Sequence, residues 1–222
     1  MIVPAVEIAE RIKAEDDYEA DPLVIRPTPS IEETGQGGSA SIDLRLGTWF
    51  ETPRPRRTPV LDIFNQGDPE YSEKQLTKTC YVPFGGRFLL HPRNFVLAVT
   101  LEWIRIPSDL AGFVAGKSKW GRRGLIIATA TGVHPRFTGC LTLELANVGE
   151  IPIAIYPGLA ICQLFLHRLT KAAPLTNQTA FSGFARPTLG TLEPDPFARR
   201  LFESGQTIQG FTDSDVSETG AS

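Results

Sequence analysis

The chain has 222 residues, 41% of them hydrophobic and 21% charged, and a formal net charge of −3. This length can bury a core as one large domain or as a domain with tails, and the acidic balance argues against a general binder of nucleic-acid polymers. No apolar run reaches the roughly 18 residues that a membrane-spanning helix needs, and the N-terminus lacks the features of a signal peptide.

The N-terminal third combines one predicted helix with one predicted strand. Apolar spacing in residues 4–16 predicts a short amphipathic helix, and residues 31–40 have the composition of a loop. Alternating apolar residues from position 42 predict a strand that ends at Gly47. Residues 52–79 are polar and rich in proline, which indicates an excursion or flap from the main domain.

Strand patterns dominate from residue 81 onwards. The segment 87–107 predicts two or three strands, broken at His91–Asn94. The segments that follow are short, β-branched and bounded by glycine or proline: 124–133, 139–149, 151–158 and 159–169. Such spacing is typical of an all-β barrel or sandwich and leaves no room for βαβ crossovers.

The predicted organisation is a β-barrel domain followed by a tail. We expect the barrel in residues 1–170 and an irregular, Pro-rich arm in residues 171–200. Residues 201–222 are polar and match the composition of a disordered tail.

The chain has three cysteines, Cys80, Cys140 and Cys162, which lie far apart in the sequence. Because Cys140 and Cys162 lie in apolar stretches, we expect buried free thiols. Free thiols are typical of a reducing compartment, so the sequence predicts a cytoplasmic protein.

A cationic run, "GKSKWGRRGL", occupies residues 116–125. If its centre forms one helical turn, Ser118 and Arg122 share a face, and the backbone N–H groups at its start suit a phosphate. A charged turn in contact with solvent explains the same pattern, so two interpretations stay open.

A single carboxylate, Glu144, interrupts the apolar strand "CLTLELAN" at residues 140–147. The alternation places Leu141, Leu143 and Leu145 on one face and Glu144 on the other. Glu144 is therefore either a glutamate on a half-solvated sheet or a partly buried acid or base.

Metal and cofactor motifs are missing from the sequence. His91, His134 and His167 are scattered, and there is no zinc-deaminase, P-loop, HExxH or GxSxG motif. We therefore expect no metal site and no cofactor.

Several segments together resemble the dCTP deaminase branch of the trimeric dUTPase superfamily. They are "SASIDLRLG" (39–47), "LHPRNFVLAVTLEWIRIPSDLAGFVAGKS" (90–118), the cationic run, "FTGCLTLELAN" (137–147) and "IPIAIYPGLAICQLFL" (151–166). The resemblance covers about residues 5–170 in order. It implies a distorted β-barrel that assembles as a homotrimer with active sites between subunits.

The resemblance also implies an activity, the metal-free hydrolytic deamination of dCTP to dUTP and ammonia. The family's catalytic residues fall on Ser118, Arg122 and Glu144. Magnesium would be present only with the substrate phosphates. No partner other than the deoxycytidine nucleotide and further copies of the chain is implied.

The substrate-binding residues of the family also map onto this sequence. Lys117 and Lys119 would hold phosphate oxygens, and Phe137 would pack against the deoxyribose. The same surface would include Ala130, His134, Arg136 and Arg186.

Two departures from the family pattern bear on the substrate. His134 stands where an aspartate is usual, and an imidazole gains charge near neutral pH. The tail "FSGFARPT" (181–188) lacks the family's tyrosine and glutamine, which predicts weaker binding of the triphosphate.

Two further hypotheses therefore stay open. One is a binding or regulatory protein that keeps the barrel and the trimer without turnover. The other is a dUTP pyrophosphatase, which His134 argues against, because that chemistry needs a carboxylate to activate water.

Overall fold

The computed structural model describes residues 1–14, 21–29, 39–54, 64, 76–128, 132–174, 183–190 and 194–205. The chain divides into two units, one of residues 1–54 with 77–190 and one of residues 55–76 with 191–222. Most of the loop expected at 31–40 and of the flap expected at 52–79 lies outside the described residues. The first unit contains all of the named helices and strands.

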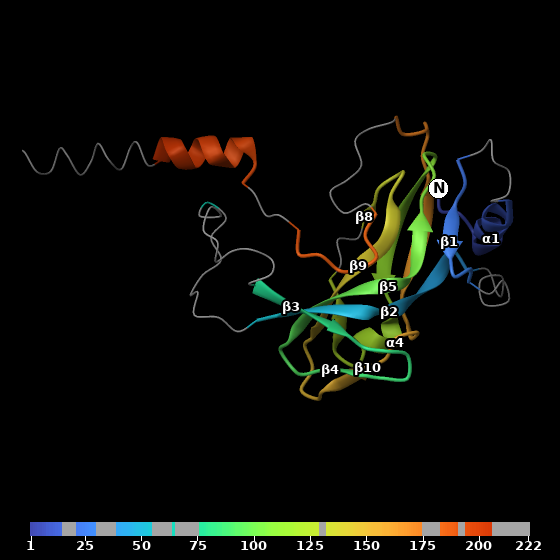
Figure 1. The fold of residues 1–222 in the computed structure, drawn as a ribbon. Coiled ribbons are helices and arrows are strands. Elements are labelled where there is room, and N and C mark those ends of the chain that lie inside the picture. The colour runs from blue at the N-terminus through green and yellow to red at the C-terminus, as the bar shows by residue number, and fades with distance from the viewer. Residues whose placement is uncertain are drawn as a thin grey trace, which may run out of the picture. The chain divides into compact units, whose positions relative to one another are not determined.

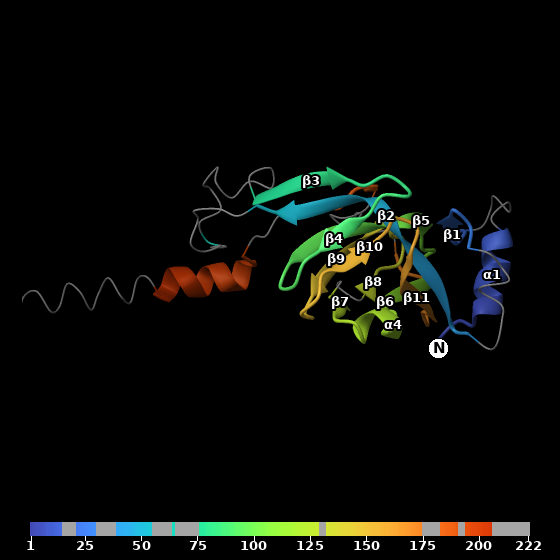
Figure 2. The same cartoon turned by 90° about the horizontal axis from the view of Figure 1, so that it is seen from below.

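A curled, nine-stranded sheet forms the first unit (Figures 1 and 2). Its strands are β1 (Val24–Arg26), β2 (Ser41–Pro53), β3 (Thr77–Tyr81), β5 (Phe95–Arg105), β6 (Leu110–Gly116), β7 (Leu125–Ile127), β8 (Gly132–Val133), β9 (Thr138–Asn147) and β11 (Ala160–Arg168). Their order is β7-β9-β5-β2-β11-β6-β8, with β1 on β5 and β3 on β2. A separate pair joins β4 (Phe88–Leu90) to β10 (Ile153–Ile155).

These strands pair in antiparallel fashion, which confirms the predicted β-rich fold without βαβ crossovers. The break predicted at His91–Asn94 is also confirmed, because β4 ends at Leu90 and β5 begins at Phe95. In the part of the chain that the structure describes, no helix is long and apolar enough to cross a membrane.

The core lies inside the curled sheet, and the alternation of the sequence explains it. Ile42, Leu44 and Leu46 of β2 are fully buried, as are Leu143 and Leu145 of β9. Each buried leucine or isoleucine contributes about 1.5–3 kcal/mol through removal of apolar surface from water. The same alternation directs every second residue of β9 to the opposite face.

The predicted N-terminal helix is present as α1 (Ala5–Lys13). Its apolar stripe, including Ile8 and Ile12, is buried against the core. Two hydrogen bonds from the guanidinium of Arg11 to the carboxylate of Asp109, at 3.1 and 2.8 Å, hold its outer face.

The predicted strand end at Gly47 is wrong, because β2 continues to Pro53. The pairing of β2 with β5 shifts register between Leu46 and Phe50. A Cβ atom at Gly47 would lie 3.0 Å from the carbonyl oxygen of Thr100. The glycine therefore permits a close approach of two backbones at this irregularity, a common role of glycine inside strands.

Residues 183–190 belong to the first unit and lie beside β9, to which they are hydrogen-bonded. The N–H of Gly183 donates to the carbonyl of Thr138 at 2.6 Å, and the N–H of Cys140 donates to the carbonyl of Phe184 at 2.9 Å. We call residues 183–190 the strap.

A helix spans residues 196–205 in the second unit, and its first turn is capped by the carboxylate of Asp195. The boundary expected at residue 201 falls inside this helix. Residues 206–222 lie outside the described part of the chain.

Candidate active site

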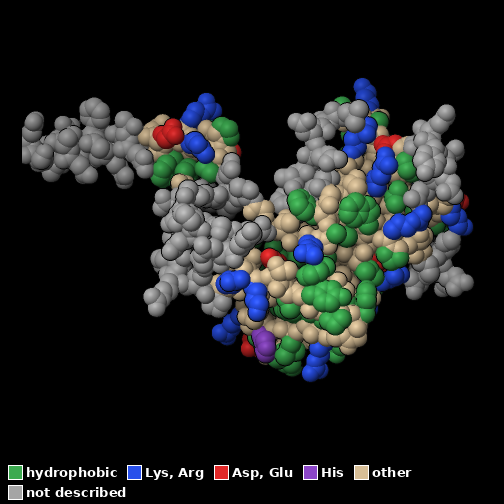
Figure 3. Space-filling view, in the orientation of Figure 1, with side chains coloured by type: hydrophobic (Ala, Val, Ile, Leu, Met, Phe, Trp, Pro, Cys, Tyr) green, Lys and Arg blue, Asp and Glu red, His purple; other side chains and the backbone are tan. Residues whose placement is uncertain are grey.

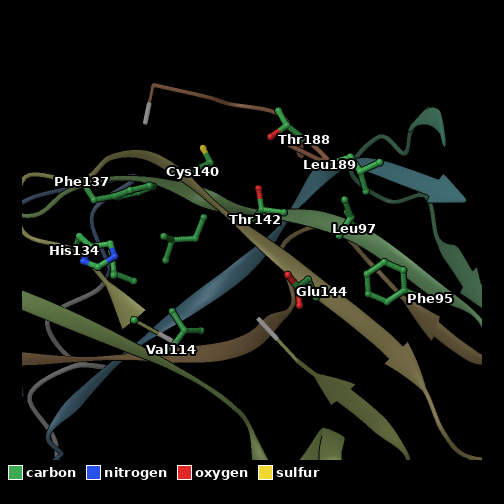
Figure 4. A pocket seen from close by; sticks show the side chains of 13 residues that line it. Phe95, Leu97, Val114, His134, Phe137, Cys140, Thr142, Glu144, Thr188 and Leu189 are labelled. Carbon is green, nitrogen blue, oxygen red and sulfur yellow. The ribbon is translucent and has the colours of Figure 1, made fainter. Parts of the chain in front are cut away.

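A pocket of about 420 Å³ opens on the first unit, and the outer face of β9 forms its floor (Figure 4). Most of its wall is apolar. Polar side chains enter it from His134, Thr142, Glu144 and Thr188. A largely apolar wall with a few convergent polar groups is the usual form of a small-molecule site.

Glu144 lies in this pocket because of its place on β9. It pairs with Leu97 of β5 across the sheet, and its carbonyl accepts a 2.9 Å hydrogen bond from the N–H of Ala128. Its side chain is half-buried, and Figure 4 shows the carboxylate among the side chains that line the pocket. This position favours the hypothesis of a partly buried acid or base over that of a solvated glutamate.

His134 and Phe137 reach the same pocket from the turn that follows β8. The N–H of Phe137 donates to the carbonyl of His134 at 3.2 Å, which closes the turn, and the Phe137 ring is buried. Arg136, between them, has a φ of 65°. The guanidinium of Arg136 instead faces Asp21, at 3.9 Å, and the carbonyl of Ala173, at 3.3 Å.

The helical turn predicted in the cationic run is present as α4 (Ser118–Gly121). Trp120 packs against the core, and its indole N–H donates to the carbonyl of Ala160 at 3.1 Å. Ser118, Lys119 and Arg122 are exposed, and none of them lines the pocket of their own chain.

Lys117 lies directly before α4 and forms an ion pair with Asp43 of β2. In this structure the ammonium of Lys117 therefore binds a carboxylate of its own chain, whereas the resemblance implies that it binds phosphate oxygens. Ala130 lies outside the described residues.

Arg186 also contacts a protein group. Its guanidinium lies 4.0 Å from the centre of the Trp49 ring, in a cation–π contact, and Trp49 in turn packs against Tyr81. This contact ties the strap to β2, and Thr188 and Leu189 of the strap line the pocket.

The predicted site residues therefore form two groups. One group, of Glu144, His134 and Phe137, lines the pocket. The other, of Ser118, Lys119 and Arg122, is presented to solvent by α4.

Several lining residues were missed by the sequence analysis. Cys140 and Thr142 lie on the same face of β9 as Glu144, so the alternation contains the signal for both. Burial, and to a smaller extent the charge of Glu102, raises the pKa of the Cys140 thiol to about 11. The thiol is therefore neutral at physiological pH and a poor nucleophile. Thr188 is the last residue of the tail that the resemblance connects with the triphosphate, whereas no pattern in the sequence points to Leu189.

The sequence profile of the family described as dCTP deaminase-like matches residues 2–169. The chain belongs to this family. The match confirms the resemblance and covers most of the first unit. This dCTP deaminase-like protein is thus related to nucleotide-deaminating enzymes.

Curated relatives and a solved structure agree with the family. A "dCTP deaminase, dUMP-forming" of Methanobrevibacter smithii is 37% identical over 155 residues, covering 69% of this chain and 76% of that protein. A protein with the same name from Corynebacterium jeikeium is 41% identical over 140 residues, covering 60% of this chain and 69% of that one. Their names specify dUMP as the product, where the resemblance implied dUTP.

The crystal structure of the 2'-deoxycytidine 5'-triphosphate deaminase from Agrobacterium tumefaciens is similar to this fold, with a TM-score of 0.54 at 17% identity. The similarity covers 74% of this chain and 47% of that chain, so this protein matches about half of its length. At this identity the comparison supports the fold.

Proposed function

We propose that this dCTP deaminase-like protein converts dCTP and two waters into dUMP, ammonia and pyrophosphate. The observation that carries the proposal is the half-buried carboxylate of Glu144 in a mainly apolar pocket. The names of the curated relatives support the substrate and the product.

In the first step a water attacks the ring carbon that bears the amino group. Glu144 accepts a proton from this water and returns it to the departing amine, which leaves as ammonia. Ser118 and Arg122 orient the water and stabilise the charge that develops on the ring. Lys119 is exposed on α4 and is suited to the phosphates.

In the second step another water attacks the phosphorus next to the sugar, and pyrophosphate leaves. The substrate is the dUTP produced by the first step. His134 lies on the wall of the same pocket, where the resemblance places an aspartate, and in this proposal its imidazole takes the place of that carboxylate and accepts a proton from the water. Because the two steps depend on different residues, release of ammonia and release of pyrophosphate are measured separately.

Ammonia and pyrophosphate released from dCTP and from dUTP test the proposal. We expect both products in equal amounts from dCTP. Ammonia alone would limit the activity to dUTP formation, and pyrophosphate from dUTP alone would support the pyrophosphatase hypothesis. Tight nucleotide binding without either product would support the binding-protein hypothesis.

We propose that the protein acts as a homotrimer in which each pocket receives α4 from a neighbouring copy. The separation of Glu144 from Ser118 and Arg122 within one chain supports this arrangement. Large hydrophobic side chains, including Phe95, Phe113 and Ile126, are also exposed on the first unit. Figure 3 shows hydrophobic side chains in patches on the visible surface, and such patches commonly mark subunit contacts.

We further propose that deamination needs no zinc. Among the described residues, no group of three or more His, Cys, Asp or Glu side chains lies close enough together to hold a metal ion. Addition of a zinc chelator should leave ammonia release unchanged, whereas removal of magnesium should weaken binding of the phosphates. A loss of ammonia release that zinc restores and magnesium does not would contradict this proposal.

A further inference from the structure

α4 packs against β7 and places Trp120 against the core, and three polar contacts fix where it begins. The N–H of Lys117 donates to the carbonyl of Ile161 at 3.2 Å, and the indole of Trp120 donates to Ala160. Both of these contacts go to β11. The side chain of Lys117 makes a third contact, its ion pair with Asp43 on the neighbouring strand β2.

This ion pair is partly shielded from water. The side chain of Lys117 is 23% exposed and that of Asp43 is 44% exposed. Lys117 is the residue before the first turn of α4, with φ −75° and ψ 130°, so the direction in which the turn begins is set there. Ser118 follows immediately, and the N–H of Arg122 donates to the carbonyl of Ser118 at 3.0 Å.

A second carboxylate, Glu102, interacts electrostatically with Asp43. Burial raises the pKa of Glu102, which lies behind it on β5, and the charge of Asp43 raises that pKa further. Arg45, two residues from Asp43 on the same face of β2, donates its backbone N–H to Glu102 at 2.8 Å. The charge of Asp43 is therefore felt by the buried Glu102, and its ion-pair partner is the ammonium of Lys117.

We propose that Asp43 is a positioning residue of the deaminase site, which holds the ammonium of Lys117 and so fixes how α4 presents Ser118 and Arg122. The inference rests on the function proposed above. It assigns the ammonium of Lys117 to the orientation of α4, and it leaves the phosphates to Lys119.

Asp43→Asn tests the proposal, with Asp109→Asn as a matched control. Asp109 is also an ion-paired aspartate, it is 42% exposed, and it holds Arg11 of α1. Hydrogen exchange should become several-fold faster in residues 117–124 for Asp43→Asn and in α1 for Asp109→Asn. Unchanged exchange in residues 117–124 would overturn the proposal, whether or not the protein deaminates dCTP.

Kinetics supply the second readout. Asp43→Asn should lower kcat for ammonia release by about 10- to 100-fold, because misplaced catalytic groups lose much of their effect, and it should raise KM by a smaller factor, because Lys119 moves with α4. Asp43→Glu should restore part of the rate. A lower KM with kcat unchanged would show that Lys117 had been released to bind phosphate, and would overturn the proposal.

A double variant tests whether Asp43 acts through Lys117. If it does, Asp43→Asn combined with Lys117→Met should be no slower than the slower single variant. Fully additive losses would contradict this route. If the wild-type protein releases no ammonia, the proposed function fails, and hydrogen exchange in residues 117–124 still decides whether Asp43 positions α4.

Discussion

Glu144 is the residue on which the proposed chemistry depends. Glu144→Gln keeps the shape of the side chain but cannot accept a proton from water. Loss of a general base typically costs about 10² to 10⁴ in rate, so ammonia release should fall by this factor while dCTP binding stays close to that of the wild type. Glu150→Gln, at an exposed glutamate, is the control and should keep full activity. Wild-type turnover in Glu144→Gln would show that Glu144 has only a structural role.

A second carboxylate, Glu102, is fully buried, and it affects the stability of the fold. One of its oxygens accepts from the N–H of Arg45, and the other lies 3.9 Å from the Nε of Arg45 without a hydrogen-bond partner. Burial is the main cause that raises the pKa of Glu102. The folded state therefore binds the proton more tightly than the unfolded state does.

This difference makes stability depend on pH. As pH rises above the ordinary glutamate value, the folded protein holds more protons than the unfolded chain, so the free energy of unfolding falls. Each unit of pKa increase contributes about 1.4 kcal/mol. Glu102→Gln can still accept from Arg45, so it should remove this dependence, and its free energy of unfolding should increase relative to that of the wild type as pH rises above 4.5. Urea unfolding at a fixed protein concentration measures the difference, and a gain by the wild type over this range would contradict the assignment.

At the scale of elements, sequence periodicity predicted most of the sheet. The alternation in β9 identified the buried leucines and placed Glu144 on the opposite face. The continuation of β2 beyond Gly47 was not predictable, because it depends on a close contact with β5. The resemblance connected residues 181–188 with the triphosphate, but the attachment of the strap to β9 was not predictable. Its pairing with β9 uses backbone groups, which any residue supplies.

The strap yields an element-scale prediction. Arg186→Met removes the cation–π contact with Trp49, which at an exposed site is worth about 0.5–1 kcal/mol. Hydrogen exchange in residues 183–190 should therefore become about two- to fivefold faster. Lys171→Met removes an exposed cation elsewhere and should leave this exchange unchanged. Equal exchange in the wild type and Arg186→Met would show that the contact does not hold the strap.

At the scale of the whole molecule, the proposed site residues of one chain fall into two groups, one in the pocket and one exposed at α4. The family resemblance named the members of both groups and implied sites between subunits, and the separation of the two groups within one chain agrees with that expectation. A homotrimer predicts a mass of about three times 24.3 kDa in sedimentation or light scattering. A monomer at micromolar concentrations would leave each pocket without Ser118 and Arg122.

The central claim is that Glu144 of one copy works with Ser118 and Arg122 of another. Its most direct test is ammonia release from dCTP by mixed trimers of Glu144→Gln and Ser118→Ala subunits. Each variant alone should be nearly inactive. Random mixing in equal amounts should restore about a quarter of the wild-type activity, because that share of sites combines an intact Glu144 with an intact Ser118 from a neighbour. Mixed trimers that stay as inactive as the separate variants would contradict a shared site.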